Sequence, residues 1–483
     1  MKTLFSKGII QLKNRMIIEQ IYTGCLAQGA YYIESNGEVA IIDPLREVQD
    51  YIEKADKNKA KIKYIFETHF HADFVSGHVT LAERTGAKIV YGPTAKTNFD
   101  SIIAENNQVF KVGSITITVL HTPGHTMESS CFLLKDEKGK DIALFSGDTL
   151  FLGDVGRPDL AQKGHLTERD LAGFLYQSLR NKIMTLADDV IVYPAHGAGS
   201  ACGKNLSSET VGTIGNQKET NYALRTDMTK EEFVKEVTDG LLPPPAYFPL
   251  NVKLNKEGYK NIDDVIKNSA KPLSVEAFQI QANETDALIL DVRHQSEFIK
   301  GFIPQSIFIG LGGTFAPWVG ALIKDIKQPI LLVTPKGEEE DTIIRLSRVG
   351  FDNVLGYLDG SFETWKNASK EIDTLQSVTA DVLEDKIKQN ALVFDVRKPG
   401  EYAKEHIAVA RSTPLDFLNE HISKFPKKGD FYLQCAGGYR SVIAASILKA
   451  RGFHNVIDVA KGYSAVRNTN IERTYAVCSS TLK

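Results

Sequence analysis

A repeat in the second half of the chain constrains the fold more than any other feature of the sequence. The segment ALILDVRHQSEFIKGFIPQSI (287–307) returns as ALVFDVRKPGEYAKEHIAVAR (391–411), and VGFDNVLGYLDGSFETW (349–365) returns as RGFHNVIDVAKGYSAVR (451–467). Each copy places a short apolar run before helical sequence, which is typical of a buried strand in a parallel sheet. The repeat predicts two homologous α/β domains, each a parallel sheet with helices on both faces.

The first half of the chain alternates strand-like runs with helical sequence. Helices are predicted after Thr167 and after Thr229, where Glu232 completes a capping-box pattern. The segment 240–258 has four prolines and few helical signals, so we interpret it as a linker at a domain edge. We expect three domains, at 1–255, 256–372 and 373–483. The strand-like runs are EVAIIDP (38–44), KIKYIFET (61–68), SITITVLH (114–121), SCFLLK (130–135), DIALFSGD (141–148) and DVIVYPAH (189–196).

Charge and composition argue against several classes of protein. Lys and Arg number 57 against 60 Asp and Glu, a net charge of −3, which argues against binding to nucleic acid. No run of about 18 apolar residues occurs, so we expect no membrane span. The N-terminus has no sustained apolar core and no cleavage site, and we expect a mature, cytoplasmic chain. Five scattered cysteines favour free thiols over disulfides, with Cys478 an exposed or mobile one.

Side chains that bind metals gather at the ends of the predicted strands. In an extended segment, side chains two residues apart point the same way, so three ligands of THFHADF can converge. Strand-end loops at one sheet edge are where ligands gather in α/β folds. The sequence therefore predicts a metal site. The candidates are His69, His71 and Asp73 in THFHADF, His125 in HTPGHT, Asp148 in SGDTL and His196 in YPAHG.

These four motifs, in this order, resemble the metallo-β-lactamase superfamily, and GRPDL (156–160) resembles its persulfide dioxygenases. The resemblance covers about half of the chain and implies an αββα sandwich with the metal at one edge of the two sheets. It implies His69, His125 and Asp148 as ligands of one Fe(II) per site. Two histidines and one carboxylate leave open positions that suit Fe(II) and O₂ chemistry. His71, Asp73 and His196 would then orient ligands, substrate or water.

The residue at position 74 bears on whether the site binds one metal ion or two. The superfamily's two-metal hydrolases use a histidine at this position, so a second site here lacks one nitrogen ligand. Phe74 favours a single ion without identifying the metal. The alternative is that His71, Asp73 and His196 bind a second ion.

Two further residues are candidates near this site. Arg157 matches the substrate-binding arginine of the persulfide dioxygenases, and its alternative is a salt bridge to Asp159. Cys202 follows His196 closely in the sequence. It is either a thiol that takes part in substrate binding or sulfur handling, or a buried structural cysteine.

A second candidate site is QCAGGYRS (434–441), between an apolar strand and a helix. Backbone N–H groups and the helix N-terminus favour an anion, so they should lower the pKa of the thiol and stabilise a persulfide. The alternative is an ordinary turn with an inert cysteine. The motif C-x-x-G-x-R-S resembles the rhodanese family of sulfurtransferases. It implies that Cys435 is the sulfur-carrying nucleophile, in a loop with Gly437, Gly438, Arg440 and Ser441.

The first repeat copy differs at this loop. Its sequence is VTPKGEEED (333–341), with no cysteine and four acidic residues, which would repel a persulfide or thiosulfate. We expect this copy to have a structural role. In the second copy, Asp395 and Arg397 are expected to support the fold.

Together, these features imply a persulfide dioxygenase–rhodanese fusion that detoxifies sulfide. Its substrates would be O₂ and a persulfide of glutathione, coenzyme A or bacillithiol, and sulfite would be converted to thiosulfate. Two alternatives stay open: a dinuclear zinc thioester hydrolase of the glyoxalase II type fused to rhodanese modules, and a sulfur-relay or persulfide-sensing protein with a structural metal. We also expect a homo-oligomer.

Overall fold

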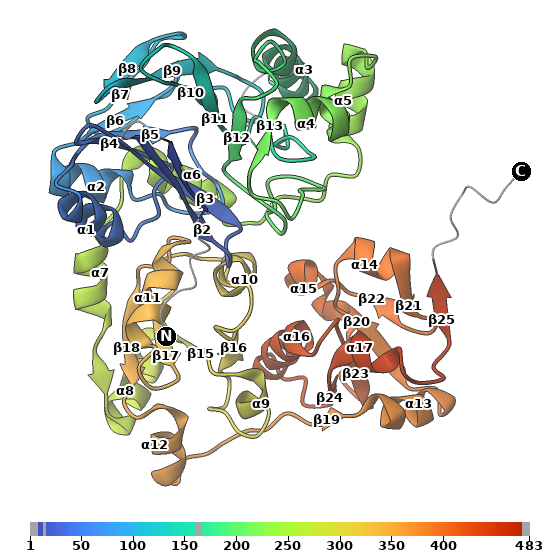
Figure 1. Ribbon diagram of the computed structural model, residues 1–483. Helices are drawn as coiled ribbons and strands as arrows, with labels where there is room; N and C mark the ends of the chain where they lie inside the picture. The colour runs from blue at the N-terminus through green and yellow to red at the C-terminus, as the bar shows by residue number, and fades with distance from the viewer. Residues whose placement is uncertain (1–7, 13–15, 161–165, 476–483) are drawn as a thin grey trace, which may run out of the picture. The chain divides into compact units, whose positions relative to one another are not determined.

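The computed structural model describes residues 8–12, 16–160 and 166–475 (Figure 1). The predictions about the start of the chain (1–7) and about Cys478 lie outside these residues. The chain forms two compact units, Met1–Ile262 with Ser347–Gly350, and Asp263–Leu346 with Phe351–Lys483. No described helix combines the length and the apolar character that crossing a membrane requires. The domain boundaries at 255/256 and 372/373 stay predictions.

The first unit is built on two sheets. The seven-stranded sheet has the order β1-β2-β3-β4-β5-β6-β7, antiparallel up to β4 and parallel from there. Its strands are β1 (Gly8–Leu12), β2 (Met16–Thr23), β3 (Gln28–Ser35), β4 (Glu38–Ile42), β5 (Lys61–Glu67), β6 (Lys88–Tyr91) and β7 (Ile102–Ile103). The six-stranded sheet runs β13-β12-β11-β10-β9-β8. Its strands are β8 (Val109–Val112), β9 (Ile115–His121), β10 (Ser130–Lys135), β11 (Asp141–Gly147), β12 (Ile191–Pro194) and β13 (Gly212–Thr213).

Three apolar layers give this unit its αββα architecture. The inner faces of the two sheets share one core, which includes Phe66, Phe132 and Phe145. Residues of the first sheet's outer face pack with helices α1 and α2, and those of the second sheet's outer face pack with α3 and α5. The predicted sandwich is confirmed. The helices of this unit are α1 (Gln49–Lys57), α2 (His78–Thr85), α3 (Glu168–Ser178), α4 (Ile214–Thr220), α5 (Lys230–Thr238) and α6 (Phe248–Glu257).

All six predicted strands are present, and both predicted capped helices form. Thr167 caps α3, and Thr229 makes a capping box with Glu232 at the start of α5. The interpretation of 240–258 as a linker with few helical signals is wrong in part, because its second half is the ten-residue helix α6. Pro249 lies in the first turn of α6, where the missing N–H is tolerated.

The second unit contains the two repeat copies, each with a five-stranded sheet. The strand orders correspond, β14-β18-β17-β15-β16 and β19-β24-β23-β20-β22, and every pairing is parallel, as predicted. The strands are β14 (Pro272–Leu273), β15 (Leu288–Asp291), β16 (Ile307–Phe308), β17 (Ile330–Val333), β18 (Val354–Leu358), β19 (Ser377–Val378), β20 (Leu392–Asp395), β22 (Arg411–Ser412), β23 (Phe431–Gln434) and β24 (Val456–Val459). A separate pair joins β21 (Glu405–Ile407) to β25 (Arg473–Tyr475).

The copies also share a buried ion pair. Arg293 binds Asp291 in the first copy and Arg397 binds Asp395 in the second, each with a shortest contact of 2.6 Å. The expectation that Asp395 and Arg397 support the fold agrees with this repetition. The helices of these copies are α8 (Val275–Thr285), α9 (Gln295–Phe298), α10 (Phe315–Leu322), α11 (Glu339–Ser347), α12 (Ser361–Asn367), α13 (Ala380–Lys388), α14 (Pro399–Lys404), α15 (Leu418–His421), α16 (Tyr439–Ala450) and α17 (Gly462–Val466), with α7 (Ile262–Ser269) before them.

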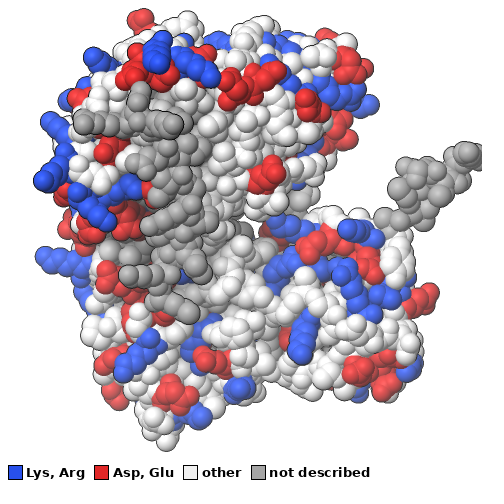
Figure 2. Space-filling view, viewed as in Figure 1, with Lys and Arg blue, Asp and Glu red and all other residues white. Residues whose placement is uncertain are grey.

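Charged side chains of both signs are interspersed on the visible surface. Figure 2 shows groups in which Lys and Arg lie beside Asp and Glu, with no large area of one sign among the described residues of this face, in keeping with the net charge of −3. The described cysteines Cys25, Cys131, Cys202 and Cys435 are free thiols, as predicted.

Candidate metal centre and cysteine loop

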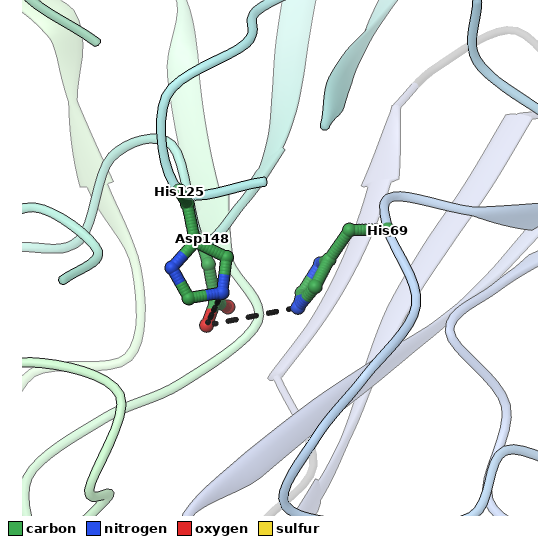
Figure 3. A group of neighbouring side chains, drawn as sticks. All are labelled: His69, His125 and Asp148. Atoms are coloured by element: carbon green, nitrogen blue, oxygen red, sulfur yellow. Dashed lines mark ion pairs between the residues drawn. The ribbon is translucent and has the colours of Figure 1, made fainter. Parts of the chain in front are cut away.

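Three buried side chains meet at the edge of the two sheets of the first unit. His69 follows β5, His125 lies between β9 and β10, and Asp148 follows β11 (Figure 3). Asp148 Oδ2 lies 3.4 Å from His125 Nε2 and 3.8 Å from His69 Nε2. Among the described residues, neither oxygen of Asp148 has a hydrogen-bond partner, although both are buried. A cation would satisfy these orphaned oxygens, so the three residues fit a metal ion.

Hydrogen bonds occupy Nδ1 of His69 and of His125 and leave Nε2 of each ring available to bind a metal. His125 Nδ1 lies 2.8 Å from the carbonyl oxygen of Arg157, which only an N–H can approach favourably. Thr68 donates its hydroxyl to Asp43 Oδ2, so its oxygen accepts from His69 Nδ1 at 3.0 Å. In the neutral tautomer of each ring that these bonds favour, Nε2 carries the free lone pair, and both Nε2 atoms face Asp148. Burial, and then the neighbouring imidazoles, hold the pKa of His69 well below its usual value, so His69 is neutral, the form that can bind a metal.

Asp43 holds the strand end that carries His69. Its carboxylate accepts hydrogen bonds from the N–H and the hydroxyl of Thr68, both at 2.8 Å. Gln28 Nε2 donates to the Asp43 carbonyl at 2.9 Å, and Asp43 adopts a positive φ of 49°. In the sequence, Asp43 stands out only as part of a strand-like run. Its position near the end of the strand-like run EVAIIDP is the sequence feature that could have indicated a role at the site.

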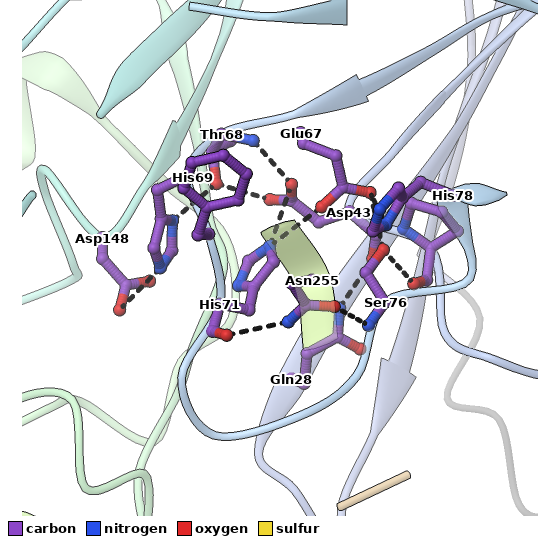
Figure 4. A network of polar contacts seen from close by, with 12 residues as sticks. Gln28, Asp43, Glu67, Thr68, His69, His71, Ser76, His78, Asp148 and Asn255 are labelled. Carbon is purple, nitrogen blue, oxygen red and sulfur yellow. Dashed lines mark hydrogen bonds and ion pairs between the residues drawn. The ribbon is translucent and has the colours of Figure 1, made fainter. Parts of the chain in front are cut away.

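His71 directs its Nε2 toward two carboxylates other than Asp148. Its Nε2 lies 3.1 Å from Asp43 Oδ1 and 3.7 Å from Glu67 Oε2 (Figure 4). Burial alone would lower the pKa of His71, but these carboxylates raise it to about 9. An imidazolium cannot ligate a metal, so His71 in this state is a partner of Asp43.

Asp73 and His196 lie next to the three donors. His196 Nε2 is 3.5 Å from Asp73 Oδ2 and 3.6 Å from Asp148 Oδ1. The ligating atoms of His71, Asp73 and His196 lie within 4.8 Å of one another. These distances leave open the alternative that His71, Asp73 and His196 bind a second ion.

The loop that carries Phe74 is held by a residue of α6. Phe74 is fully buried, and its ring centroid lies 4.4 Å from that of His71. Asn255 Nδ2 donates to the carbonyl oxygens of His71 and Phe74, both at 2.8 Å, and Asn255 Oδ1 accepts from Ser76 N at 2.9 Å (Figure 4). Asn255 was missed because its helix was interpreted as a linker.

Arg157 and Cys202 are both buried close to the donors. Arg157 makes two hydrogen bonds to Asp159, at 2.6 and 2.7 Å, which is the salt bridge considered as the alternative. Its substrate role stays a prediction. Cys202 Sγ lies within 4.8 Å of ligating atoms of Asp148 and His196. Burial, and then the charges of Asp73 and Asp148, raise the pKa of Cys202 well above its usual value.

Cys435 directly follows β23 and opens the loop before α16. The N–H of Gly438 donates to Cys435 Sγ at 3.1 Å, and Ser441 Oγ lies 3.5 Å from the sulfur. Gly438 has a φ of 95°, which favours glycine. The predicted anion-stabilising loop therefore has one N–H directed at the sulfur.

Arg440 is anchored by Glu401, a residue that the sequence analysis did not identify. The guanidinium donates to both carboxylate oxygens, at 2.6 and 2.9 Å. Burial opposes ionisation of Glu401, but Arg440 prevails and lowers the pKa of that carboxyl. Gly437 is exposed and lies in the same loop.

The corresponding loop of the first copy has the opposite charge. Val333 and Gln434 occupy equivalent strand ends, so Gly337 matches Gly438 and Glu339 matches Arg440. The Gly337 N–H donates to the carboxylate of Glu339 at 3.1 Å, whereas the Gly438 N–H donates to sulfur. In the first copy, the Glu339 carboxylate therefore accepts the hydrogen bond that, at the equivalent N–H of the second copy, goes to the thiol of Cys435.

Comparison with known families agrees with this organisation. Residues 23–196 match the model of the metallo-beta-lactamase superfamily, and residues 274–368 and 379–469 match that of the rhodanese-like domain. A metallo-beta-lactamase of Staphylococcus aureus subsp. aureus COL, solved at 2.1 Å, aligns with a TM-score of 0.63 at 30% identity, over 72% of this chain and 99% of that one. The chain belongs to the metallo-beta-lactamase superfamily and carries two rhodanese-like domains.

Curated relatives of the metallo-beta-lactamase domain have two kinds of name. A probable hydroxyacylglutathione hydrolase of Schizosaccharomyces pombe is 31% identical over 32% of this chain and 58% of its own length. The mitochondrial persulfide dioxygenase ETHE1 of Mus musculus is 28% identical over 45% of this chain and 78% of its own length. The chain thus spans just over half of the first relative's length.

Proposed function

We propose that this protein oxidises a low-molecular-weight thiol persulfide with O₂ and converts the sulfite formed to thiosulfate. The main support is the buried set of His69, His125 and Asp148, two histidines and one carboxylate, in the same chain as the Cys435 loop. That donor set matches the arrangement used by non-haem Fe(II) oxygenases. The persulfide dioxygenase relative supports the same assignment.

His69, His125 and Asp148 would hold a single Fe(II). When bound, Fe(II) supplies the redox chemistry that allows O₂ and a persulfide to react. The balanced reaction is R–S–SH + O₂ + H₂O → R–SH + SO₃²⁻ + 2 H⁺. The chain's own residues orient the two rings with Nε2 toward Asp148, through the carbonyl of Arg157 at one Nδ1 and the Asp43–Thr68 pair at the other.

The Cys435 loop would perform the second reaction. The Cys435 thiolate attacks the outer sulfur of R–S–SH, which releases R–SH and leaves a cysteine persulfide. Sulfite then attacks the outer sulfur of that persulfide, which releases thiosulfate and restores the thiolate. The Gly438 N–H and the helix N-terminus stabilise negative charge on sulfur in both steps.

The alternative is a dinuclear zinc thioester hydrolase of the glyoxalase II type. The grouping of Asp73 and His196 beside Asp148 and the hydroxyacylglutathione hydrolase relatives favour it. The two proposals differ in measurable ways. A hydrolase would contain close to two zinc ions per chain and would cleave thioesters without O₂ uptake, whereas the dioxygenase would contain one iron and consume O₂.

Cys435→Ser tests the coupling of the two reactions. With a low-molecular-weight persulfide as substrate, the variant should keep its rate of O₂ uptake and shift the product from thiosulfate to sulfite. Products are quantified by chromatography of the derivatised sulfur species, and O₂ uptake is followed with an electrode. An unchanged thiosulfate yield would refute the coupling.

A further inference from the structure

Tyr439 belongs to the cysteine loop, yet its side chain packs against the first rhodanese-like copy. Both copies lie in the same compact unit, and α16 adjoins β16. The Tyr439 hydroxyl donates to the Gly310 carbonyl oxygen at 2.7 Å. Its ring meets the Phe308 ring edge-on, with the centroids 5.9 Å apart and the planes at 75°. Burial raises the pKa of Tyr439, so the hydroxyl keeps the proton that it donates.

The Tyr439 ring occupies a slot lined by the glycine-rich segment that follows β16, residues 310–313. A Cβ at Gly313 would lie 2.5 Å from Cζ of Tyr439, closer than any real contact of this kind. A Cβ at Gly312 would meet no atom within 4 Å. The absence of a side chain at Gly313 therefore makes room for Tyr439, and Gly312 provides a matched control.

A second bond fixes α16 further along its length. Ser446 Oγ accepts a hydrogen bond from Phe308 N at 2.9 Å, and Ser446 is fully buried. The residues from Ser441 to Leu448 are all buried, so α16 is enclosed on every side. The first copy thus holds this helix at its first residue and again two turns later.

We infer that Tyr439 is a positioning residue, through which the first copy sets the geometry of the Cys435 loop. Tyr439 directly follows Gly438, whose N–H meets the sulfur at 3.1 Å, and directly precedes Arg440. A shift of Tyr439 moves both groups relative to Cys435. The first copy has no cysteine in its own loop. It therefore influences sulfur transfer at Cys435 by holding α16, a helix of the second copy. The inference concerns the Cys435 site of the proposed function and rests on that function only for the turnover measurements.

The test compares Tyr439→Phe, Gly313→Ala and Gly312→Ala in the full chain. The pH profile of Cys435 alkylation by iodoacetamide, followed on the Cys435 peptide by mass spectrometry, reports the thiolate without any turnover. Sulfur transfer from thiosulfate to cyanide gives kcat and KM. O₂ uptake reports the separate metal centre, and thermal unfolding reports folding.

Tyr439→Phe should shift the alkylation midpoint to higher pH and lower kcat by about three- to tenfold, the effect of one lost hydrogen bond, with KM little changed. Gly313→Ala should shift both quantities further in the same direction, and Gly312→Ala should match the parent chain. O₂ uptake should be unchanged in all three.

Alkylation profiles of Tyr439→Phe and Gly313→Ala that match that of Gly312→Ala would overturn the inference. If Gly313→Ala does not fold, Tyr439→Phe decides alone. A parent chain that transfers no sulfur refutes the transferase proposal, while the alkylation profiles still decide the role of Tyr439.

Discussion

The metal centre and the cysteine loop are assembled in opposite ways. The three candidate metal donors, His69, His125 and Asp148, come from three separate loops. Asp43 holds the strand end before His69, and Asn255 holds the loop after it. The cysteine loop takes its sulfur, its N–H donor and its arginine from residues 435–440. A site built from distant segments depends on the whole domain around it, whereas a contiguous loop depends mainly on its own backbone and on what holds that backbone.

The largest effect should separate the two sites completely. His69→Ala removes one of three donors, so bound iron and O₂ uptake should fall to background. Transfer of sulfur from thiosulfate to cyanide through Cys435 should survive. Metal analysis, an oxygen electrode and a thiocyanate assay measure these quantities. Intact iron occupancy would show that the ligand assignment is wrong.

Asp43→Asn should weaken the metal centre without dismantling it. An amide offers one acceptor oxygen where the carboxylate offers two, so one bond to Thr68 is lost and His69 is less firmly oriented. We expect iron affinity to fall by about 10- to 100-fold, measured by competition with a chelator. The exposed Asp56→Asn is the control. Equal affinities in the two variants would remove Asp43 from the metal centre.

Asn255→Ala should affect the metal loop through its backbone. The change leaves two carbonyl oxygens and one N–H without their partner. Each unsatisfied buried group destabilises a protein by about 1–3 kcal/mol, so the first unit should unfold at lower denaturant concentration and bind iron more weakly. Lys253→Ala, on the exposed side of α6, controls for the helix. The two variants should differ clearly, and identical unfolding curves would contradict the role of Asn255.

The smallest effect is expected at the contiguous site. Glu401→Gln removes a partly exposed ion pair with Arg440. Such pairs contribute about 0.2–1 kcal/mol, so kcat/KM for sulfur transfer should change by less than about fivefold, with O₂ uptake unaffected. A loss of 100-fold or more would place Glu401 in the transfer chemistry itself.

The same contrast explains what the sequence could predict. Strands such as β5 and β11 have clear apolar patterns, and the cysteine loop is one uninterrupted motif, so both were recognisable. The roles of Asp43, Asn255 and Glu401 could not be recognised in the sequence. Each acts through a hydrogen bond to a residue far along the chain. The helix α6 was hidden by the prolines at its start and by asparagines, which are weak helix formers, on its buried face.

Arg157 illustrates a different limit. Sequence spacing allowed both a salt bridge to Asp159 and a contact with substrate, and nothing in the residue types distinguishes them. The structure contains the salt bridge. A carboxylate that already occupies the guanidinium must be displaced or shared if an anionic substrate is to bind there.

The position of Asn255 also has a consequence for synthesis. It closes the loop of His71 from 184 residues downstream. At about 5–20 residues per second, the ribosome needs about 10–40 s to make that stretch, during which the loop is without its clamp. Before residue 255 is made, the loop of His71 lacks these hydrogen bonds, so the candidate metal centre can reach its final geometry only after that point in synthesis.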